Sequence, residues 1–233
     1  MSTGSADQRR RLTLFDLDHT LLHGDSDVLW CDFLIAHGLL DRDLFSKRNQ
    51  DMEARYKAGT VGVQEFADFY MSTLAGRTPS QWDALRQDFF TTQVRPRIPE
   101  AATALVQQHR AAGDTLLMTT ATNRFITELT AAHFGISHLL ATEPEIVDGL
   151  FTGRTLGAPN MREGKVQRLH QWLSGQGLTL NEFHSSAYSD SINDLPLLEA
   201  VDRAVCVDPD PALKAVATQR GWEVLAISGA GAS

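Results

Sequence analysis

Short, continuous apolar runs alternate with helical patterns along most of this chain, and this alternation limits its fold more than any other feature. Apolar runs without polar residues at every second position are typical of parallel strands buried on both faces. They cover residues 12–15, 115–119, 138–141, 184–188, 204–207 and 223–227. The helical patterns between them cover residues 99–112, 123–134, 162–173 and 211–220. This order predicts an α/β fold with a Rossmann-like, doubly wound parallel sheet.

A long helical stretch follows the first strand and interrupts the alternation. Its apolar residues recur with helical spacing from residue 26 to residue 90, and Gly38, Gly59 and Gly76 divide it into about four helices. An insertion at this place is most simply an all-helical cap over the ends of the strands. We therefore predict three segments: a core of residues 1–22 and 92–228, a helical cap of residues 23–91, and a disordered tail of residues 229–233.

A second, shorter interruption follows the strand at residues 138–141. The segment Glu145–Gly153 contains Asp148-Gly149 between pairs of apolar residues. Asp-Gly in this setting is a strong signal for a two-residue turn between antiparallel strands. The segment is therefore predicted to form a β-hairpin.

The composition excludes several functional classes. Acidic residues outnumber basic ones by 29 to 21, and the formal net charge of -8 disfavours a nucleic-acid partner. No apolar run approaches the roughly 20 residues that span a bilayer, and the polar segment 1–11 does not resemble a signal peptide. Cys31 and Cys206 stand far apart, which is typical of buried free thiols in a reducing compartment and not of a zinc site. These features predict a cytoplasmic protein without a membrane or nucleic-acid partner, acting on small molecules.

Two carboxylates, Asp16 and Asp18, end the first predicted strand, and a hydroxyl residue, Thr20, follows them. Residues two apart in a strand point the same way, so both carboxylates can face one small space. Carboxylates in one cleft repel each other unless a cation or a proton lies between them. The alternative is that this pair only begins a solvated loop or caps a helix.

Three further polar segments follow predicted strands or begin a helix. Thr120 follows the strand at 115–119, where a helix start would offer backbone N–H groups to an anion, although Thr122 or Asn123 could simply cap that helix. Lys165 lies in the first turn of a helix, an unusual place for a cation unless it is a solvated surface residue. Asp190 and Asp194 follow the strand at 184–188, and Asp194 could instead cap the next helix.

Together these residues predict a phosphoryl-transfer site. Carboxylates and phosphate oxygens are the ligands that Mg²⁺ prefers, while Thr120 and Lys165 would neutralise the phosphoryl oxygens. Asp16 would attack phosphorus and form an aspartyl-phosphate. Asp18 would protonate the leaving alcohol and later deprotonate the attacking water.

In this order the four motifs resemble those of the haloacid-dehalogenase-like superfamily of phosphohydrolases, in particular its phosphoserine-phosphatase-like branch (subfamily IB). The first motif is Asp16–Thr20, the second contains Thr120, the third contains Lys165, and the fourth is Asp190–Asp194. The resemblance extends over residues 12–227. It implies a catalytic group formed by Asp16, Asp18, Thr120 and Lys165, and a Mg²⁺ site formed by Asp16, the backbone carbonyl of Asp18, Asp190 and Asp194. It implies that the phosphate is bound by Thr120, Ala121, Lys165 and Asn193.

The resemblance also bears on the substrate. In the phosphoserine enzymes an acidic residue shortly after the first motif meets the substrate amine, and Asp25 stands at the matching place. The cap arginine that grips the substrate carboxylate has no counterpart, since Asp68 or a neighbour stands there. A small phosphorylated metabolite with an amine is therefore expected, and histidinol phosphate and phosphoserine are the candidates; some similar proteins are described as histidinol-phosphatases. A phosphotransferase or mutase of the same superfamily and a phospho-accepting regulatory module remain alternatives.

Overall fold

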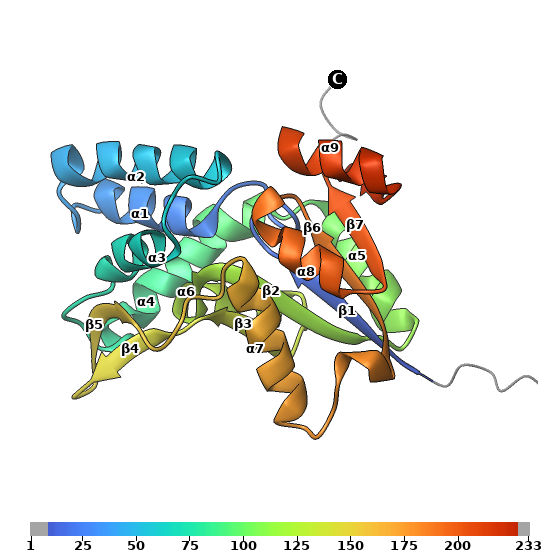
Figure 1. Cartoon of the computed structure of the whole chain (residues 1–233). Coiled ribbons are helices and arrows are strands. Elements are labelled where there is room, and N and C mark those ends of the chain that lie inside the picture. Colours follow the sequence, from blue (N-terminus) through green and yellow to red (C-terminus); the bar gives the residue numbers. More distant parts are fainter. Residues whose placement is uncertain (1–8, 228–233) are drawn as a thin grey trace, which may run out of the picture.

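The computed structural model describes residues 9–227 of the 233-residue chain, so the predicted tail at 229–233 lies outside the described residues. The predicted fold class is confirmed, because six strands form one parallel sheet in the order β3-β2-β1-β6-β7-β8 (Figure 1). The strands are β1 (Arg10–Asp16), β2 (Thr115–Asn123), β3 (His138–Thr142), β6 (Phe183–Ser189), β7 (Arg203–Val207) and β8 (Glu223–Leu225).

Helices cover both faces of this sheet, as a doubly wound fold requires. One face packs against α5 (Glu100–Ala111) and α6 (Arg124–His133). The other packs against α7 (Glu163–Ser174), α8 (Leu195–Ala200) and α9 (Pro211–Arg220). Alternation along β1 serves both layers, since Leu12 and Leu14 belong to the core beneath α7–α9 and Phe15 belongs to the core beneath α5 and α6.

The centre of the sheet is the place where the chain changes direction. Strand β1 pairs with β2 on one side and with β6 on the other, so successive strands are added outward in both directions. Asp16 is level with Thr119 of β2, and Phe15 is level with Tyr188 of β6. Ligands of open α/β sheets bind at such a switch point, beyond the carboxyl ends of the strands. The predicted site residues follow those ends.

Four helices lie between β1 and the rest of the core, and we call residues 26–89 the helical cap (Figure 1). They are α1 (Ser26–Ala36), α2 (Arg42–Lys57), α3 (Val63–Ser72) and α4 (Pro79–Phe89). A π-helical turn η1 (Phe90–Val94) and a 3₁₀ turn η2 (Arg95–Arg97) lead back into the core. Trp30, Phe33 and Trp82 of the cap belong to the same apolar core as α6, so the cap is packed onto the sheet-bearing part of the molecule.

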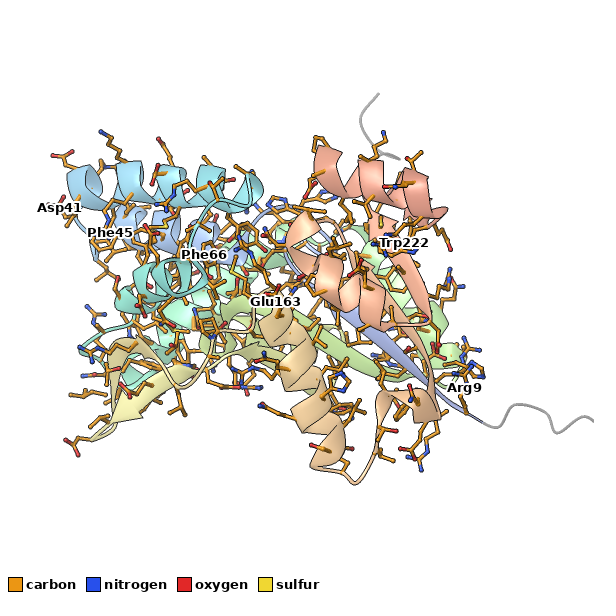
Figure 2. All side chains as sticks on the ribbon, in the orientation of Figure 1. Arg9, Asp41, Phe45, Phe66, Glu163 and Trp222 are labelled. Carbon is orange, nitrogen blue, oxygen red and sulfur yellow. The ribbon has the colours of Figure 1, made fainter. Side chains whose placement is uncertain are left out.

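The cap also has an apolar cluster of its own, formed by Cys31, Ile35, Phe66, Phe69 and Tyr70 with Met161 of the core at its edge. Figure 2 shows how the cap side chains are distributed: Asp41 and Phe45 lie at the end of the cap far from the sheet, and Phe66 lies on the side toward the core. Asp41 and Thr78 cap α2 and α4 through their side chains. The sequence pattern between residues 26 and 90 therefore reflects buried helix faces.

The predicted hairpin is confirmed, and it packs against the cap. Strands β4 (Pro144–Val147) and β5 (Leu150–Thr155) pair antiparallel, and Gly76 donates a backbone hydrogen bond to the carbonyl of Phe151. Gly153, at a φ of 81°, lets β5 approach α3 closely, because a Cβ there would lie 3.3 Å from Cα of Ser72, the last residue of α3, and 3.0 Å from Cβ of Ala75. The hairpin thereby ties the α3–α4 connection to the core.

Two composition-based expectations can be compared with the structure. Cys31 and Cys206 are free and buried, as predicted. Among the helices of residues 9–227, none has the length and apolar character needed to cross a membrane.

Two short 3₁₀ turns, η3 (Leu180–Glu182) and η4 (Ile192–Asp194), complete the elements of the core.

Candidate active site

The loop after β1 directs Asp16 into the switch point. The backbone N–H groups of Thr20, Leu21 and Leu22 all donate to the carbonyl of Leu17, which folds the chain into a tight turn. This turn brings the hydroxyl of Thr20 to 3.1 Å from Oδ2 of Asp16 and 3.2 Å from Oδ1 of Asp190. The first and fourth motifs therefore meet, with one carboxylate from each on either side of a single hydroxyl.

Lys165 reaches the same place from the start of α7. Its Nζ lies 2.7 Å from Oδ1 of Asp16 and 2.6 Å from Oδ2 of Asp194, and its side chain is 1% exposed. The alternative of a solvated surface lysine is therefore wrong. Gly164 makes this approach possible, because a Cβ at that position would overlap the carbonyl of Pro159. The third motif thus supplies a buried cation between two carboxylates.

The side chain of Asp194 bonds to this cluster and does not cap the helix that follows it. Its side chain makes no capping bond to α8, while its Oδ2 accepts from Lys165 and, at 2.7 Å, from the hydroxyl of Ser189. Ser191 accepts a hydrogen bond from the backbone N–H of Asn193 and caps η4 instead. The serines on either side of Asp190 therefore hold the fourth motif in shape.

Asp18 is surrounded by hydrogen-bond donors. Its Oδ1 accepts from the backbone N–H and the hydroxyl of Ser26, at 2.7 and 2.6 Å. Its Oδ2 accepts from the hydroxyls of Thr120, at 3.1 Å, and Thr122, at 2.9 Å. Because Ser26 is the first residue of α1, the cap and the second motif hold the Asp18 carboxylate together.

The second motif lies where β2 departs from regular pairing. The register with β3 shifts between Thr119 and Asn123, so Ala121 lies in an irregular part of the strand. Asn123 accepts from the backbone N–H of Ile126 and caps α6, which leaves Thr120 and Thr122 free to contact Asp18. The capping role considered for Thr122 thus belongs to Asn123.

Asn193, predicted to bind phosphate, instead contacts the cap in this structure. Its Nδ2 donates to the carbonyl of Tyr56 at 3.1 Å, and its Oδ1 accepts from Nε of Arg162 at 3.1 Å. These contacts join the fourth motif to the C-terminal end of α2. Its role toward phosphate stays a prediction.

Asp25, predicted to meet a substrate amine, lies buried at the start of α1. Its Oδ1 accepts from the backbone N–H groups of Asp27, at 2.9 Å, and Val28, at 3.0 Å, so it caps the helix. Burial, together with the charge of Asp18, raises the pKa of Asp25 to about 8. Burial and the charges of Asp25 and Asp18 also hold the pKa of Asp27 well above its ordinary value. The first turn of α1 thus adds two buried acidic groups beside the first motif.

The acidic centre itself is short of positive charge. Burial raises the pKa of Asp16 to about 7, because the repulsion from Asp194 and Asp18 adds to it and Lys165 only partly offsets it. Burial and the charges of Asp16 and Asp194 hold the pKa of Asp190 well above its ordinary value. Burial lowers the pKa of Lys165, but Asp16 and Asp194 outweigh it, so the lysine stays protonated. One buried cation faces three carboxylates.

This charge imbalance fits a hard divalent cation. Asp16 and Asp190 share the single hydroxyl of Thr20, which can donate only one hydrogen bond. Residues 9–227 contain no group of three or more His, Cys, Asp or Glu side chains arranged to hold a metal. Mg²⁺ does not require one, since it is commonly bound by one or two carboxylates with water and substrate phosphate. The paired oxygens of Asp16 and Asp190 suit that requirement.

Sequence reasoning missed several residues of the site. Thr20 was not assigned a role and Thr122 was considered only as a helix cap, although each stands two residues beyond a predicted site residue. Ser26 and Tyr56 come from the cap, where the helical pattern shows buried faces but not what those faces meet. Asp68 is exposed and accepts from Gln64, so it does not reach the centre.

Comparison with known proteins identifies the family of this chain. The model of the haloacid dehalogenase-like hydrolases matches residues 13–199. A histidinol-phosphatase of Neisseria meningitidis serogroup C (strain 8013) is 37% identical over 218 residues, which is 93% of this chain and 98% of that protein. A crystal structure of a protein of unknown function from Bordetella pertussis Tohama I is 46% identical, with a TM-score of 0.88, and the match covers 94% and 99% of the two chains.

A more distant structure has the same fold. A phospho-aspartyl intermediate analogue of phosphoserine phosphatase has a TM-score of 0.70 at 14% identity, over 95% of each chain. The Rossmann-like sheet, the helical cap and these matches define a phosphatase. The chain belongs to the haloacid dehalogenase-like hydrolase family.

Proposed function

We propose that this phosphatase hydrolyses a small phosphomonoester with Mg²⁺ bound and through an aspartyl-phosphate on Asp16. The observation that carries this proposal is the position of the Asp16 carboxylate. One of its oxygens is held by Lys165, and the other faces Asp190 across the hydroxyl of Thr20. A carboxylate held in this way is directed on both sides and charge-compensated on one by Lys165, while the side toward Asp190 is where a bound cation would complete the compensation that attack on a phosphate dianion requires.

The remaining residues have roles that follow from their contacts. An oxygen of Asp16 attacks phosphorus while the bond from phosphorus to the ester oxygen breaks, and Asp18 gives its proton to that oxygen. In the second step Asp18 takes a proton from water, the water oxygen attacks phosphorus, and the Asp16 carboxylate and inorganic phosphate are released. Lys165 and Thr120 stabilise the charge on the phosphoryl oxygens. Bound Mg²⁺ would be held by Asp16, Asp190 and the backbone carbonyl of Asp18, and would supply further charge neutralisation.

An amine-bearing phosphomonoester suits the surroundings of this centre. Asp25 and Asp27 add buried acidic groups at the start of α1, on the cap side of Asp18. A positively charged leaving group would relieve the repulsion among these carboxylates. The relative from Neisseria meningitidis is named a histidinol-phosphatase, and histidinol phosphate carries an amine but no carboxylate. We therefore propose histidinol phosphate ahead of phosphoserine, since Asp68, which stands where a cap arginine would grip the carboxylate of phosphoserine, is an exposed acid that accepts from Gln64.

The test compares a panel of phosphorylated metabolites, including histidinol phosphate and phosphoserine, with p-nitrophenyl phosphate, measuring inorganic phosphate in the presence of Mg²⁺. Asp16→Asn should abolish phosphate release from every compound, and EDTA should do so reversibly. The matched control is Asp43→Asn, at an exposed position of α2, which should retain full activity. Full turnover by Asp16→Asn would overturn the proposed nucleophile, and full turnover in EDTA would overturn the metal requirement.

The substrate assignment has a separate test. Asp25→Asn preserves the oxygen that caps α1 but removes the carboxylate, so it should lower kcat/KM for histidinol phosphate more than for p-nitrophenyl phosphate. Equal losses for both compounds would reject the amine contact without touching the phosphatase assignment. A preference for phosphoserine over histidinol phosphate in the panel would reject the proposed substrate.

A further inference from the structure

Arg162 has a backbone conformation that residues other than glycine rarely adopt. Its φ is 54° and its ψ is -124°, and it immediately precedes α7, three residues before Lys165. Strained conformations of this kind persist only where the surrounding contacts enforce them, and they are frequent at functional sites. The contacts of its side chain therefore need an explanation beyond local chain folding.

The Arg162 side chain joins the core to the segment that follows the C-terminal end of α2. Its Nη2 donates to the carbonyl of Gly59 at 2.9 Å and to that of Val61 at 3.3 Å. Its Nε donates to Oδ1 of Asn193, which in turn donates from Nδ2 to the carbonyl of Tyr56. We call Arg162 and Asn193 together the cap clasp. Between them they bind three backbone carbonyls at the end of α2 and just after it, those of Tyr56, Gly59 and Val61.

The chemistry of the α2 terminus favours a guanidinium at this position. Gly59, at a φ of 68°, directs the chain away from the helix just after its last turn. The carbonyls of Gly59 and Val61, in the connection that follows α2, then converge on Nη2 of Arg162. A guanidinium holds its donors in a rigid plane and can bind two carbonyls and an amide oxygen at fixed positions, whereas the ammonium of a lysine is a single point at the end of a flexible stem. The clasp therefore favours arginine.

The residue whose backbone the clasp holds also faces the reactive centre. The ring of Tyr56 stacks on Phe66 at a centroid distance of 4.8 Å. Tyr56 packs against the same apolar cluster as Ala121, which follows Thr120, and its carbonyl is bound by Asn193, the neighbour of Asp194. Burial and the charges of Asp194 and Asp16 raise the pKa of its phenol well above the ordinary value, in keeping with this position. A movement of the α2 terminus would therefore move an aromatic side chain of the cap relative to the nucleophile.

We propose that Arg162 is a positioning residue that holds Tyr56 over the nucleophile, so that Tyr56 contacts the leaving group of the bound phosphomonoester. The fourth motif takes part through Asn193, which links the loop carrying Asp190 and Asp194 to the same turn of the cap. Substrate binding is then sensitive to a contact between two parts of the chain that lie 103 residues apart in sequence.

The test rests on the phosphatase activity and compares Arg162→Ala with a second cap–core arginine as control. Arg86 of α4 donates to the carbonyl of Phe125 and to Glu128 of α6, so Arg86→Ala also removes an arginine contact between cap and core. With p-nitrophenyl phosphate, Arg162→Ala should raise KM by roughly ten- to a hundredfold with a smaller change in kcat, because the contact of Tyr56 with the leaving group is lost when its backbone is no longer held. Arg86→Ala should leave KM unchanged. Equal KM effects in the two variants would overturn the proposal.

A double-mutant cycle separates positioning from general loosening of the cap. Tyr56→Leu preserves apolar packing on Phe66 but removes the phenol, and it should raise KM to a similar extent. If Arg162 acts through Tyr56, the double variant should bind no more weakly than either single variant. Additive effects would overturn the proposal. Arg162→Lys, which keeps the charge but not the planar donors, should recover only part of the loss, and full recovery would contradict the role of the guanidinium.

Hydrogen exchange gives a readout that does not depend on any substrate. The backbone N–H groups of Thr60 and Val61 donate to the carbonyl of Arg55 and close the end of α2. They should exchange faster in Arg162→Ala and at the wild-type rate in Arg86→Ala. Unchanged exchange in Arg162→Ala would overturn the clasp even if the substrate proposed above were correct.

Discussion

The ammonium nitrogen of Lys165 lies 2.7 Å from Oδ1 of Asp16, and both side chains are almost fully buried. A second carboxylate, Asp194, lies 2.6 Å from the same nitrogen. Taking charges out of water is costly, so this arrangement is stable only while the cation and its partners remain together. The pair links stability and chemistry, because the lysine that directs the nucleophile also compensates its burial.

Lys165→Met should therefore lower both stability and activity. The substitution retains an apolar stem but leaves two carboxylates buried without their cation, a change that costs about 3–5 kcal/mol in comparable buried pairs. Thermal denaturation should show a large fall in Tm, and turnover of p-nitrophenyl phosphate should fall by at least about a hundredfold. The control is Lys57→Met, which removes an exposed pair with Glu53 of similar length and should change Tm little. Equal Tm values for the two variants would contradict the importance of burial.

Added Mg²⁺ should stabilise the protein against heat. A ligand that binds only the folded state contributes about 2.7 kcal/mol when its concentration is a hundred times its Kd. Because the pKa of Asp16 is raised to about 7, the metal must displace a proton from this carboxyl group at lower pH. The rise in Tm should thus be larger at pH 8 than at pH 6. Asp190→Asn, measured beside the wild type by differential scanning fluorimetry, should lose most of the effect. A Tm that ignores Mg²⁺ at both pH values would contradict a metal site here.

Asp18→Asn should separate leaving groups by their basicity. An alkoxide needs a proton as its bond to phosphorus breaks, whereas p-nitrophenolate leaves readily without one. The formation of the phosphoenzyme from an alkyl phosphomonoester should slow by roughly 10²–10⁴-fold, and that from p-nitrophenyl phosphate much less. Rapid-quench measurement of the first turnover distinguishes the two. Equal slowing for both compounds would contradict protonation of the leaving group by Asp18, and no slowing for either would mean that Asp18 acts only on the later, water-dependent step.

The sequence was sufficient to predict the sheet and the convergence of the four motifs. Buried parallel strands have continuous apolar runs, and their carboxyl ends meet at one edge, so residues following β1, β2 and β6 must lie near each other. That reasoning needs no knowledge of side-chain packing. Asp16, Thr120 and Asp190 follow these strand ends, and Lys165 joins them from the start of a helix. In the structure Asp16 contacts Lys165, and Thr20 contacts Asp190.

The contacts between cap and core could not be predicted in the same way. Ser26 binds Asp18 and Arg162 binds Gly59 because the cap is packed in one particular orientation, and helical periodicity shows only that a face is buried. The conformation of Arg162 is equally hidden, since nothing in the local sequence requires a positive φ at an arginine. The capping role of Asp25 is different: an Asp directly before a helical pattern is a local signal that was available.

Asp25→Asn should stabilise the protein increasingly as the pH rises. In the folded state burial raises the pKa of Asp25 to about 8, whereas the ordinary value is 3.8. Between these values the folded protein holds a proton that the unfolded chain has lost, so the contribution of Asp25 to stability falls with rising pH, by up to about 1.4 kcal/mol per pH unit. Asn can accept the same two backbone hydrogen bonds and does not titrate.

Thermal denaturation at pH 5, 6, 7 and 8 should therefore show a Tm difference between variant and wild type that widens up to about pH 8. Asp43→Asn, at an exposed position of α2, should show no such trend. A constant difference for Asp25→Asn across this range would mean that the carboxyl group is already ionised in the fold, held so by its two N–H donors.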